Sequence, residues 1–449
     1  MKRRRKSKTI IPTFLASLII LYLGTLVFLL NTNTRQSLQI LPLNVNETVA
    51  TDSIKLSHTQ QNDLLLTTPF YIYEELDWLD ETHHVTTVGN HTFREWIELS
   101  AEERNFEMKH DDDLKFYVAA TRHPMRVENP EDAKLFVVPM LTSYIATNYL
   151  YKDERVRICR NNICGRDLLF FADELLQNST WFQKSQGKDH FVLVTSLLWQ
   201  HHHKLERWKY EHMERCNILQ FGEGDDAWNK KHDRISFNTF YVGSRCPSIP
   251  FQEKKFDIAM IADLRFRFKD EGTTKRFQDR RNICNWTKSS TFTSKYSMSI
   301  CGKGAQCPSL ANSRLGWHPR GDTISANRLF DTLLSGTIPI FTDELQLRSH
   351  QNFIRWDMLS YFIQMGPNKT QDYFLEALDA VLKNSTDMNE KTKNIIENRD
   401  LFDWDTLVPF DVYMYMLQSH LWPHTRISTS KYSALILPPI TTSSTTRPT

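Results

Sequence analysis

One segment of the sequence, from Ser313 to Ile340, concentrates side chains that suit the binding of a diphosphate. Gly321-Asp322-Thr323 is typical of a turn, and a helix is predicted to begin directly after it, near Ile324. The free backbone N–H groups at a helix N-terminus attract an anion. Arg328, about one turn into this helix, adds a planar cation that can bind a phosphate with two parallel hydrogen bonds, which a lysine cannot match.

The same predicted helix carries a carboxylate at Asp331, which can accept hydrogen bonds from the hydroxyl groups of a ribose or a sugar. An alternative interpretation is a surface ion pair between Arg328 and Asp331, which are three residues apart and would contribute about 0.2–0.5 kcal/mol. The predicted buried side of the helix consists of Leu329, Phe330, Leu333 and Leu334, and Gly336 ends the helix. Spacing alone leaves both interpretations open.

The segment resembles the donor-side signature of the exostosin-like enzymes, glycosyltransferase family 47. That signature reads approximately Pro-x-Gly-Asp-x-x-Ser/Thr-x-x-Arg-Leu-Phe-Asp, followed by Gly-x-Ile-Pro-Val. The residues that match it are Pro319, Gly321, Asp322, Ser325, Arg328, Leu329, Phe330, Asp331, Gly336, Ile338 and Pro339. Two departures stand out: Trp317-His318 replaces a usual Cys-Leu pair, and Thr337 replaces a common cysteine.

Three further stretches are similar to family motifs and follow in the expected order. They are an acidic run into a phenylalanine-containing strand at 130–139, the sequence Gly-Lys-Asp-His-Phe at 187–191, and Asp263-Leu264-Arg265 followed by Arg280-Arg281. The likeness covers roughly residues 69–420. It implies that the nucleotide sugar is bound by six residues, namely Arg265, Gly321, Asp322, Ser325, Arg328 and Asp331.

The resemblance also implies a GT-B fold, in which two Rossmann-like domains face each other, and sugar transfer from a nucleotide diphosphate sugar with inversion. Inversion requires a base that accepts the proton of the acceptor hydroxyl. The family motif offers Asp189 and His190 as catalytic candidates, and a structural turn that pins the following strand is the alternative. His201-His202-His203 follows the same predicted strand and is a further candidate.

No metal and no other cofactor is expected from the resemblance. The runs Asp111-Asp112-Asp113 and Asp403-Trp404-Asp405 match the Asp-x-Asp pattern of metal-dependent transferases, and 223–226 is also acidic. None of them follows a clear core strand, where such a motif would meet a diphosphate. Two function classes remain: an active glycosyltransferase with a glycan or glycoprotein acceptor, or a catalytically silent relative that acts as a Golgi chaperone or as a subunit of a homo- or hetero-oligomer.

Strand and helix patterns alternate along the body of the chain, which predicts an α/β fold of two doubly wound domains. Short apolar runs between breakers predict buried parallel strands, and three- or four-residue spacing predicts helices. A proline and two acids after Asn129 are typical of a helix start. The predicted strands are 71–73, 135–138, 191–194, 256–261 and 338–341, and the predicted helices are 168–176 and 273–285.

The N-terminus predicts a signal anchor. Six basic side chains lie within the first eight residues, and 10–30 is an uncharged run of 21 residues. As a helix this run is about 32 Å long, which matches a hydrocarbon core of about 30 Å. Positive residues stay cytoplasmic, so a single-pass type II protein in the Golgi membrane is expected, with the body in the lumen.

Composition agrees with a lumenal location. Outside the basic tail, the remaining 49 basic and 53 acidic side chains leave a net charge of −4, so no nucleic-acid partner is expected. Six Asn-x-Ser/Thr sites and seven cysteines also fit the secretory lumen. The close pairs Cys159/Cys164 and Cys301/Cys307 can each close a small loop, although the connectivity stays open and one thiol is left over.

The predicted parts of the chain follow from these features. A polar segment follows the anchor, and two prolines after Cys246 mark a boundary between the domains. The parts are a cytoplasmic tail at 1–9, a transmembrane anchor at 10–30, a stem at 31–68, an acceptor-side domain at 69–245, a nucleotide-sugar domain at 246–430, and a Ser/Thr/Pro-rich tail at 431–449.

Overall fold

A computed structural model gives the fold of the body of the chain. The structure describes residues 64–76, 83–95, 112–142, 157–164, 167–194, 210–220, 234–264, 271–319, 326–348 and 354–436, with short gaps inside several of these ranges. No helix in the described ranges is both long and apolar enough to cross a membrane. The predicted anchor at 10–30 lies outside the described residues, as does the part of the predicted tail beyond 436. The first residues of that tail, 431–436, belong instead to the folded body, because Tyr432, Leu435 and Ile436 are buried.

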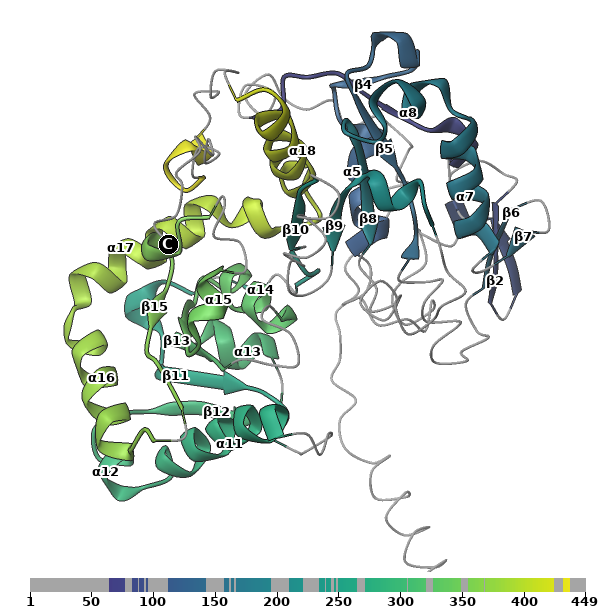
Figure 1. Cartoon of the computed structure of the whole chain (residues 1–449). Helices are drawn as coiled ribbons and strands as arrows, with labels where there is room; N and C mark the ends of the chain where they lie inside the picture. The colour runs from purple at the N-terminus through teal and green to yellow at the C-terminus, as the bar shows by residue number, and fades with distance from the viewer. Residues whose placement is uncertain are drawn as a thin grey trace, which may run out of the picture. The chain divides into compact units, whose positions relative to one another are not determined.

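The first sheet has six parallel strands in the order β10-β9-β8-β5-β1-β4 (Figure 1). The apolar run of β5 is buried along its whole length, as expected for a strand covered on both faces. The three strands predicted in this half of the chain are confirmed. The strands are β1 (Phe70–Ile72), β4 (Arg126–Val127), β5 (Leu135–Val138), β8 (His190–Val194), β9 (Asn217–Gln220) and β10 (Ser236–Asn238).

The second sheet has five parallel strands in the order β12-β11-β13-β14-β15 (Figure 1). Both strands predicted here are confirmed with their exact bounds, and the two sheets confirm an α/β fold. The strands are β11 (Phe256–Ile261), β12 (Met298–Gly302), β13 (Ser313–His318), β14 (Ile338–Phe341) and β15 (Tyr361–Phe362).

Helices alternate with the strands in both halves. The predicted helices at 168–176 and 273–285 are confirmed, each longer by one or two residues at its ends. The principal helices are α5 (Asp112–Arg122), α7 (Asp167–Asn178), α8 (Thr180–Ser185), α11 (Glu271–Trp286), α13 (Gln306–Ala311), α14 (Asn327–Leu334), α15 (Glu344–Arg348), α16 (Gln371–Lys383), α17 (Ser385–Asn398) and α18 (Val408–Leu421).

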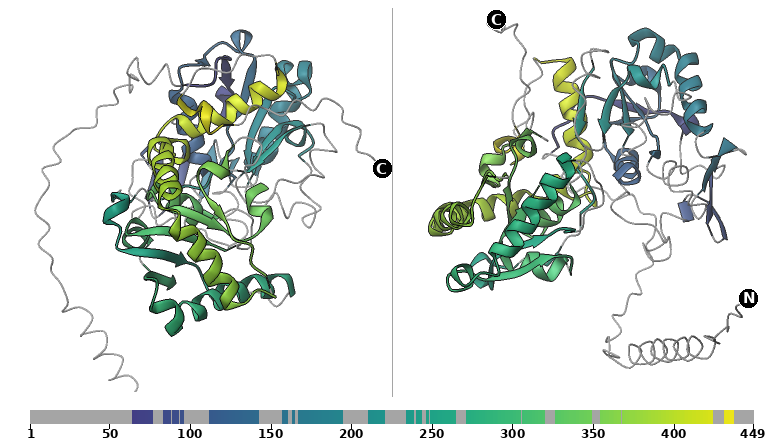
Figure 2. Two further views of the ribbon diagram at one scale, coloured as in Figure 1. Left: turned by 90° about the vertical axis from the view of Figure 1, so that its left-hand side faces the viewer. Right: turned by 60° about the horizontal axis from the view of Figure 1, so that its bottom comes forward.

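The last helix corrects the predicted domain boundaries. The sequence predicts that residues 246–430 form the second domain, but α18 packs against the first sheet. The Phe410 ring contacts Phe70 of β1 and Phe116 of α5, at centroid distances of 5.2 and 4.9 Å. Figures 1 and 2 show α18, in yellow, beside the first sheet. The chain therefore returns to the first sheet after it completes the second. Apolar periodicity identifies a helix but does not say which sheet it covers.

The predicted stem also ends earlier than expected. Residues 65 and 66 are buried, and their N–H groups donate to the Asp411 carboxylate of α18 at 2.7 and 3.0 Å. A small antiparallel sheet in the order β3-β2-β6-β7 was not predicted from the sequence. Its strands are β2 (His83–Thr87), β3 (Gly89–Thr92), β6 (Arg157–Arg160) and β7 (Ile163–Cys164).

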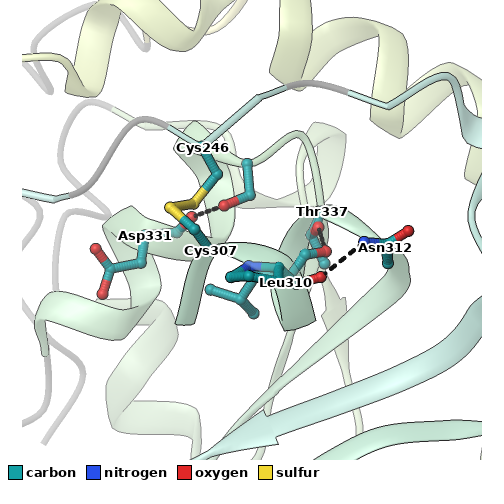
Figure 3. Close-up of a disulfide and its surroundings, with 8 residues drawn as sticks. Cys246, Cys307, Leu310, Asn312, Asp331 and Thr337 are labelled. Carbon is teal, nitrogen blue, oxygen red and sulfur yellow. Dashed lines mark hydrogen bonds between the residues drawn. A yellow bond between two sulfur atoms is a disulfide. The ribbon is translucent and has the colours of Figure 1, made fainter. Parts of the chain in front are cut away.

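Two local predictions differ from the structure. The helix start after Asn129 is a single 3-10 turn, Pro130–Asp132, because the chain becomes extended at Ala133 and enters β5 two residues later. The close pair Cys301/Cys307 does not form a disulfide. Residue 301 in β12 bonds to Cys284 of α11, and residue 307 in α13 bonds to Cys246 (Figure 3).

The remaining cysteines follow the sequence analysis. Cys159 and Cys164, on the paired strands β6 and β7, are bonded as the short loop between them predicts. Cys216 is the single free cysteine among the described residues, and it is buried. Three disulfides fit a chain that folds in an oxidising compartment.

Candidate functional site

The strand order of the second sheet marks the place where a ligand is expected. From β11 the chain passes to β12 on one side of it, and then to β13 on its other side. In parallel α/β sheets, ligands bind beyond the carboxyl ends of the two strands at such a switch point. Here these ends are at Ile261 and His318, and the residues just beyond them are Ala262 and Pro319.

Arg328 lies at this edge of the sheet. Helix α14 begins at Asn327, three residues later than predicted, because Ala326 is still extended. The Nη2 group of Arg328 donates a hydrogen bond to the carbonyl oxygen of Pro319 at 2.5 Å, so the guanidinium lies over the carboxyl end of β13. The structure therefore brings this predicted donor-binding residue to the switch point.

Asp331 lies one turn further along α14. Only 3% of Asp331 is exposed, so the alternative of an ion pair on the protein surface does not fit. Figure 3 shows its carboxylate turned away from the Cys246–Cys307 disulfide, while its carbonyl oxygen accepts hydrogen bonds from the Ser335 side chain and backbone.

The other four predicted donor-binding residues, Arg265, Gly321, Asp322 and Ser325, lie outside the described residues.

Two arginines of α11 hold the segment that leads from β11 toward residue 265. Arg280 is buried and its Nη1 donates to the carbonyl oxygen of Asp263 at 2.9 Å. The Nε of Arg281 donates to the carbonyl oxygen of Leu264 at 3.0 Å. The paired arginines of the family motif thus fix the backbone just beyond β11, and Arg280 brings a second guanidinium to this edge.

His318 also lies at this edge of the sheet, as the last residue of β13. Only 1% of this residue is exposed, and its ring packs edge-on against Phe341. Burial, followed by the positive charges of Arg328 and Arg280, lowers the pKa of His318 well below its usual value. The imidazole is therefore neutral at physiological pH. Sequence reasoning noted this residue only as a departure from the family pattern, although its place at the end of a strand was the signal that could have identified it.

Carboxylates lie near the same edge. Asp343 follows β14, and the Asp263 carboxylate forms an ion pair with Lys303 at 3.3 Å. Burial, together with the negative charge of Asp343, raises the pKa of Asp279 in α11 to about 6. The edge therefore combines two guanidinium groups with a carboxyl that titrates close to neutral pH.

Asp189 and His190 lie elsewhere, at the amino end of β8. The ring of His190 is fully buried, with Nδ1 2.7 Å from the Asp189 carboxylate and Nε2 2.7 Å from the Tyr73 hydroxyl. The Ser185 hydroxyl also donates to Asp189. Because both ring nitrogens are engaged and ligands meet the opposite ends of such strands, this geometry favours the structural alternative, and the catalytic role stays a prediction.

The structure explains why the same motif has a glycine at position 187. Gly187 has a φ of +82°, and a Cβ atom there would lie 2.7 Å from the carbonyl oxygen of Arg215. Both the backbone conformation and the close approach favour glycine. The motif therefore forms a tight turn that sets the start of β8.

The acidic runs do not gather into a metal site in the described part of the chain, where no group of three potential ligands occurs. Asp112 is buried in α5 and accepts a hydrogen bond from the backbone N–H of Val242. Asp405 is 2.5 Å from the ammonium of Lys115. The candidate residues 111, 201–203 and 223–226 lie outside the described residues.

Comparison with known proteins identifies the family. The model of the exostosin GT47 domain matches residues 86–376. A xyloglucan galactosyltransferase (XLT2) from Arabidopsis thaliana is 21% identical over 248 residues, which are 51% of this chain and 45% of the relative. A probable xyloglucan galactosyltransferase (GT20) from the same plant is 21% identical over 305 residues, which are 65% of this chain and 51% of the relative. The chain thus spans about half the length of these curated relatives.

Solved glycosyltransferase structures are similar only at a low level. Anabaena Alr3699/HepE in complex with UDP-glucose has 8% identity and a TM-score of 0.34, covering 68% of this chain and 82% of that one. The pneumococcal O-GlcNAc transferase GtfA, solved with UDP and GlcNAc, has 10% identity and a TM-score of 0.30, covering 59% and 63%. The family model alone spans more than half of the chain, which therefore belongs to the exostosin family, glycosyltransferase family 47.

Proposed function

We propose that this protein transfers a sugar from a nucleoside diphosphate sugar to a glycan or glycoprotein acceptor in the Golgi lumen, with inversion at the anomeric carbon. One observation carries the proposal. In a chain that belongs to the exostosin family, Arg328 and Arg280 converge on the carboxyl ends of β11 and β13, where a sheet of this order binds its ligand.

The chemistry follows from the charge that develops during transfer. The acceptor hydroxyl attacks the anomeric carbon and gives its proton to a base, while the bond from that carbon to the diphosphate breaks. Negative charge grows on the departing diphosphate. Guanidinium groups held in a buried edge stabilise that charge without reorganising. Arg328 and Arg280 suit this role because their side chains are already fixed by backbone carbonyl groups.

The curated relatives suggest which donor to test first. Both are named xyloglucan galactosyltransferases, so UDP-galactose is the first candidate. No metal ion is proposed, because two guanidinium groups at the switch point supply the positive charge that a metal-dependent transferase takes from a divalent cation.

The test uses the full-length protein purified in detergent. It is incubated with UDP-galactose and then with a panel of other nucleotide sugars, together with glycan acceptors, and transfer and UDP release are measured. We expect one donor to support transfer in the presence of EDTA, with the new linkage inverted by NMR. A protein that neither binds UDP nor transfers any sugar of the panel would instead support the catalytically silent class.

A further inference from the structure

His318 is a buried polar side chain whose ring lacks a hydrogen-bond partner. Neither Nδ1 nor Nε2 has a partner within the described part of the chain. The backbone of the residue is satisfied, because its carbonyl oxygen accepts a hydrogen bond from the Gln346 side chain at 2.9 Å. An unpaired buried polar group lowers stability, so its presence in a native structure calls for an explanation.

The neighbours of β13 show where this ring faces. A Cβ atom on Gly316 would lie 2.5 Å from the Thr332 side chain of α14, so this face of the strand packs against α14. Trp317 points to the opposite face and packs against Phe374 of α16, with 4.9 Å between the ring centroids. Because side chains alternate along a strand, His318 shares the face of Gly316, two residues nearer the carboxyl end.

That position puts the ring beneath the first turn of α14. The Thr332 hydroxyl donates to the carbonyl oxygen of Arg328, one turn closer to the helix start. The guanidinium of Arg328 in turn reaches Pro319, the residue after His318. Arg280 approaches from α11, and its positive charge, like that of Arg328, acts on the imidazole. A neutral ring with an unsatisfied N–H group thus lies near two cations, in surroundings that attract an anion.

We propose that His318 binds the donor directly, by donating a ring hydrogen bond to the diphosphate of the nucleotide sugar. This inference rests on the proposed function and assigns to that site a residue beyond its arginines. In the ligand-free protein the N–H group is unsatisfied, and the diphosphate oxygen satisfies it on binding. The competing explanation is a permanently bound internal water molecule, which would make His318 purely structural.

The two explanations predict opposite effects of His318→Leu. Leucine has a similar size and needs no hydrogen bond, so in our proposal the unliganded variant is at least as thermally stable as the wild type. Its affinity for UDP falls by about tenfold or more, because the lost bond is made to a charged oxygen. If an internal water holds the ring, the variant loses a satisfied network, becomes less stable, and binds UDP as the wild type does.

Full-length protein in detergent is studied by isothermal titration with UDP and by thermal unfolding. Trp317→Phe is the matched control: it removes a buried N–H group that also lacks a partner in the described residues, but on the opposite face of the strand, so UDP affinity stays unchanged. His318→Gln, which keeps an N–H donor, recovers part of the affinity and decides the matter if the leucine variant does not fold.

The outcomes separate this inference from the proposed function. A folded His318→Leu protein with wild-type affinity for UDP overturns the inference and leaves the proposed function intact. An equal loss of affinity in Trp317→Phe also overturns it, because the effect would then be a general disturbance of β13. A wild-type protein that binds no UDP overturns both. A loss confined to His318→Leu, with partial recovery in His318→Gln, supports the inference.

Discussion

Arg328 makes a hydrogen bond to the backbone at Pro319 and also faces the place where a diphosphate is expected. Arg328→Ala should therefore have two effects. The affinity for UDP should fall by roughly 10- to 150-fold, and unfolding should become easier by about 1 kcal/mol because the Pro319 carbonyl loses its partner. Arg328→Lys should restore only part of the affinity, because the planar fork is lost. Isothermal titration and thermal unfolding measure the two effects separately.

A second arginine of the same sheet provides the control. Arg314, near the amino end of β13, forms an ion pair with Asp257 at 2.8 Å and is far along the strand from the carboxyl edge. Arg314→Ala should leave UDP affinity unchanged. If the two alanine variants lose affinity equally, or if neither does, Arg328 is not a donor-binding residue.

Asp279 offers a test by pH. Burial and the charge of Asp343 raise the pKa of its carboxyl to about 6, above the value of an unfolded chain. Only below about pH 3 is the group protonated in both states, so that it costs no stability. As the pH rises toward 6 the unfolded chain gains a favourable ionisation that the folded protein resists. Asp279→Asn should thus raise the melting temperature by about 2 °C at pH 7.5 and have a much smaller effect at pH 4.

One outcome of this test would contradict the raised pKa of Asp279. Melting curves of wild type and variant are recorded from pH 4 to pH 8 in matched ionic strength. A difference that stays constant over this range would mean that the Asp279 carboxyl ionises normally in the folded protein.

Individual site residues were predictable where their type is rare and their motif is long. Arg328 and Asp331 were predicted in this way. Both lie on α14, and their binding of the donor stays a prediction. His318 was not, because a histidine that ends an apolar strand looks like core packing until the strand order shows which strands flank the switch point. Asp189 and His190 were also predicted from a family motif. A motif shows which residue types recur, but it does not show whether they bind a substrate or stabilise the fold.

At the scale of elements, strands were easier to predict than their surroundings. Residues 135–138, 258–261 and 338–341 are buried on both faces, so a continuous apolar run shows them directly. The small antiparallel sheet left no such signal in sequence such as His83–Thr87, which is short and polar. The disulfide pairing could not be predicted from the sequence either, because Cys284 and Cys301 come together only when α11 packs against β12.

The turn between α8 and β8 yields a prediction that distinguishes a structural role of Asp189 and His190 from a catalytic one. The Ser185 hydroxyl, at the end of α8, donates to the Asp189 carboxylate, which also contacts His190. If this network sets the start of β8, Ser185→Ala should lower stability by about 1 kcal/mol and leave kcat/KM for sugar transfer within about twofold. Thermal unfolding and initial-rate assays on the same preparation measure both. A large fall in kcat at unchanged stability would restore the catalytic assignment.

At the scale of the whole molecule, the predicted membrane topology has its own test. The basic residues before position 9 and the uncharged run at 10–30 predict a type II anchor. Residues 1–30 fused to a reporter should carry it to the Golgi with its C-terminus in the lumen, and glycosidase treatment of the full protein should increase its gel mobility. Protease digestion of the C-terminus in intact vesicles would contradict this topology.

Residues 65–67 contact the last helix of the body, which the sequence did not indicate. The polar segment after the anchor was predicted to extend to residue 68, yet residues 65 and 66 donate their N–H groups to Asp411 of α18. The adjacent Thr67 donates to the Gln418 side chain of the same helix at 3.1 Å. Two chain segments more than 340 residues apart thus hold each other, a contact that no local pattern can predict.

This contact predicts where the chain can be shortened. Asp411 is fully buried, and besides the two N–H groups its carboxylate meets His123 at 3.2 Å. A chain that begins at residue 70 removes both N–H donors and leaves a buried carboxylate poorly compensated, which typically costs about 3–5 kcal/mol. A chain that begins at residue 54 keeps the donors and should unfold at the temperature of the longer protein.

A second change identifies the cause. If the loss comes from the uncompensated charge, Asp411→Leu should restore much of the stability of the chain that begins at residue 70, because an apolar side chain needs no partner there. In the chain that begins at residue 54 the same substitution should instead be destabilising, because it leaves two buried N–H groups unsatisfied. The four proteins form a double-mutant cycle in chemical denaturation. Additive effects of truncation and substitution would show that Asp411 does not hold the start of the folded body.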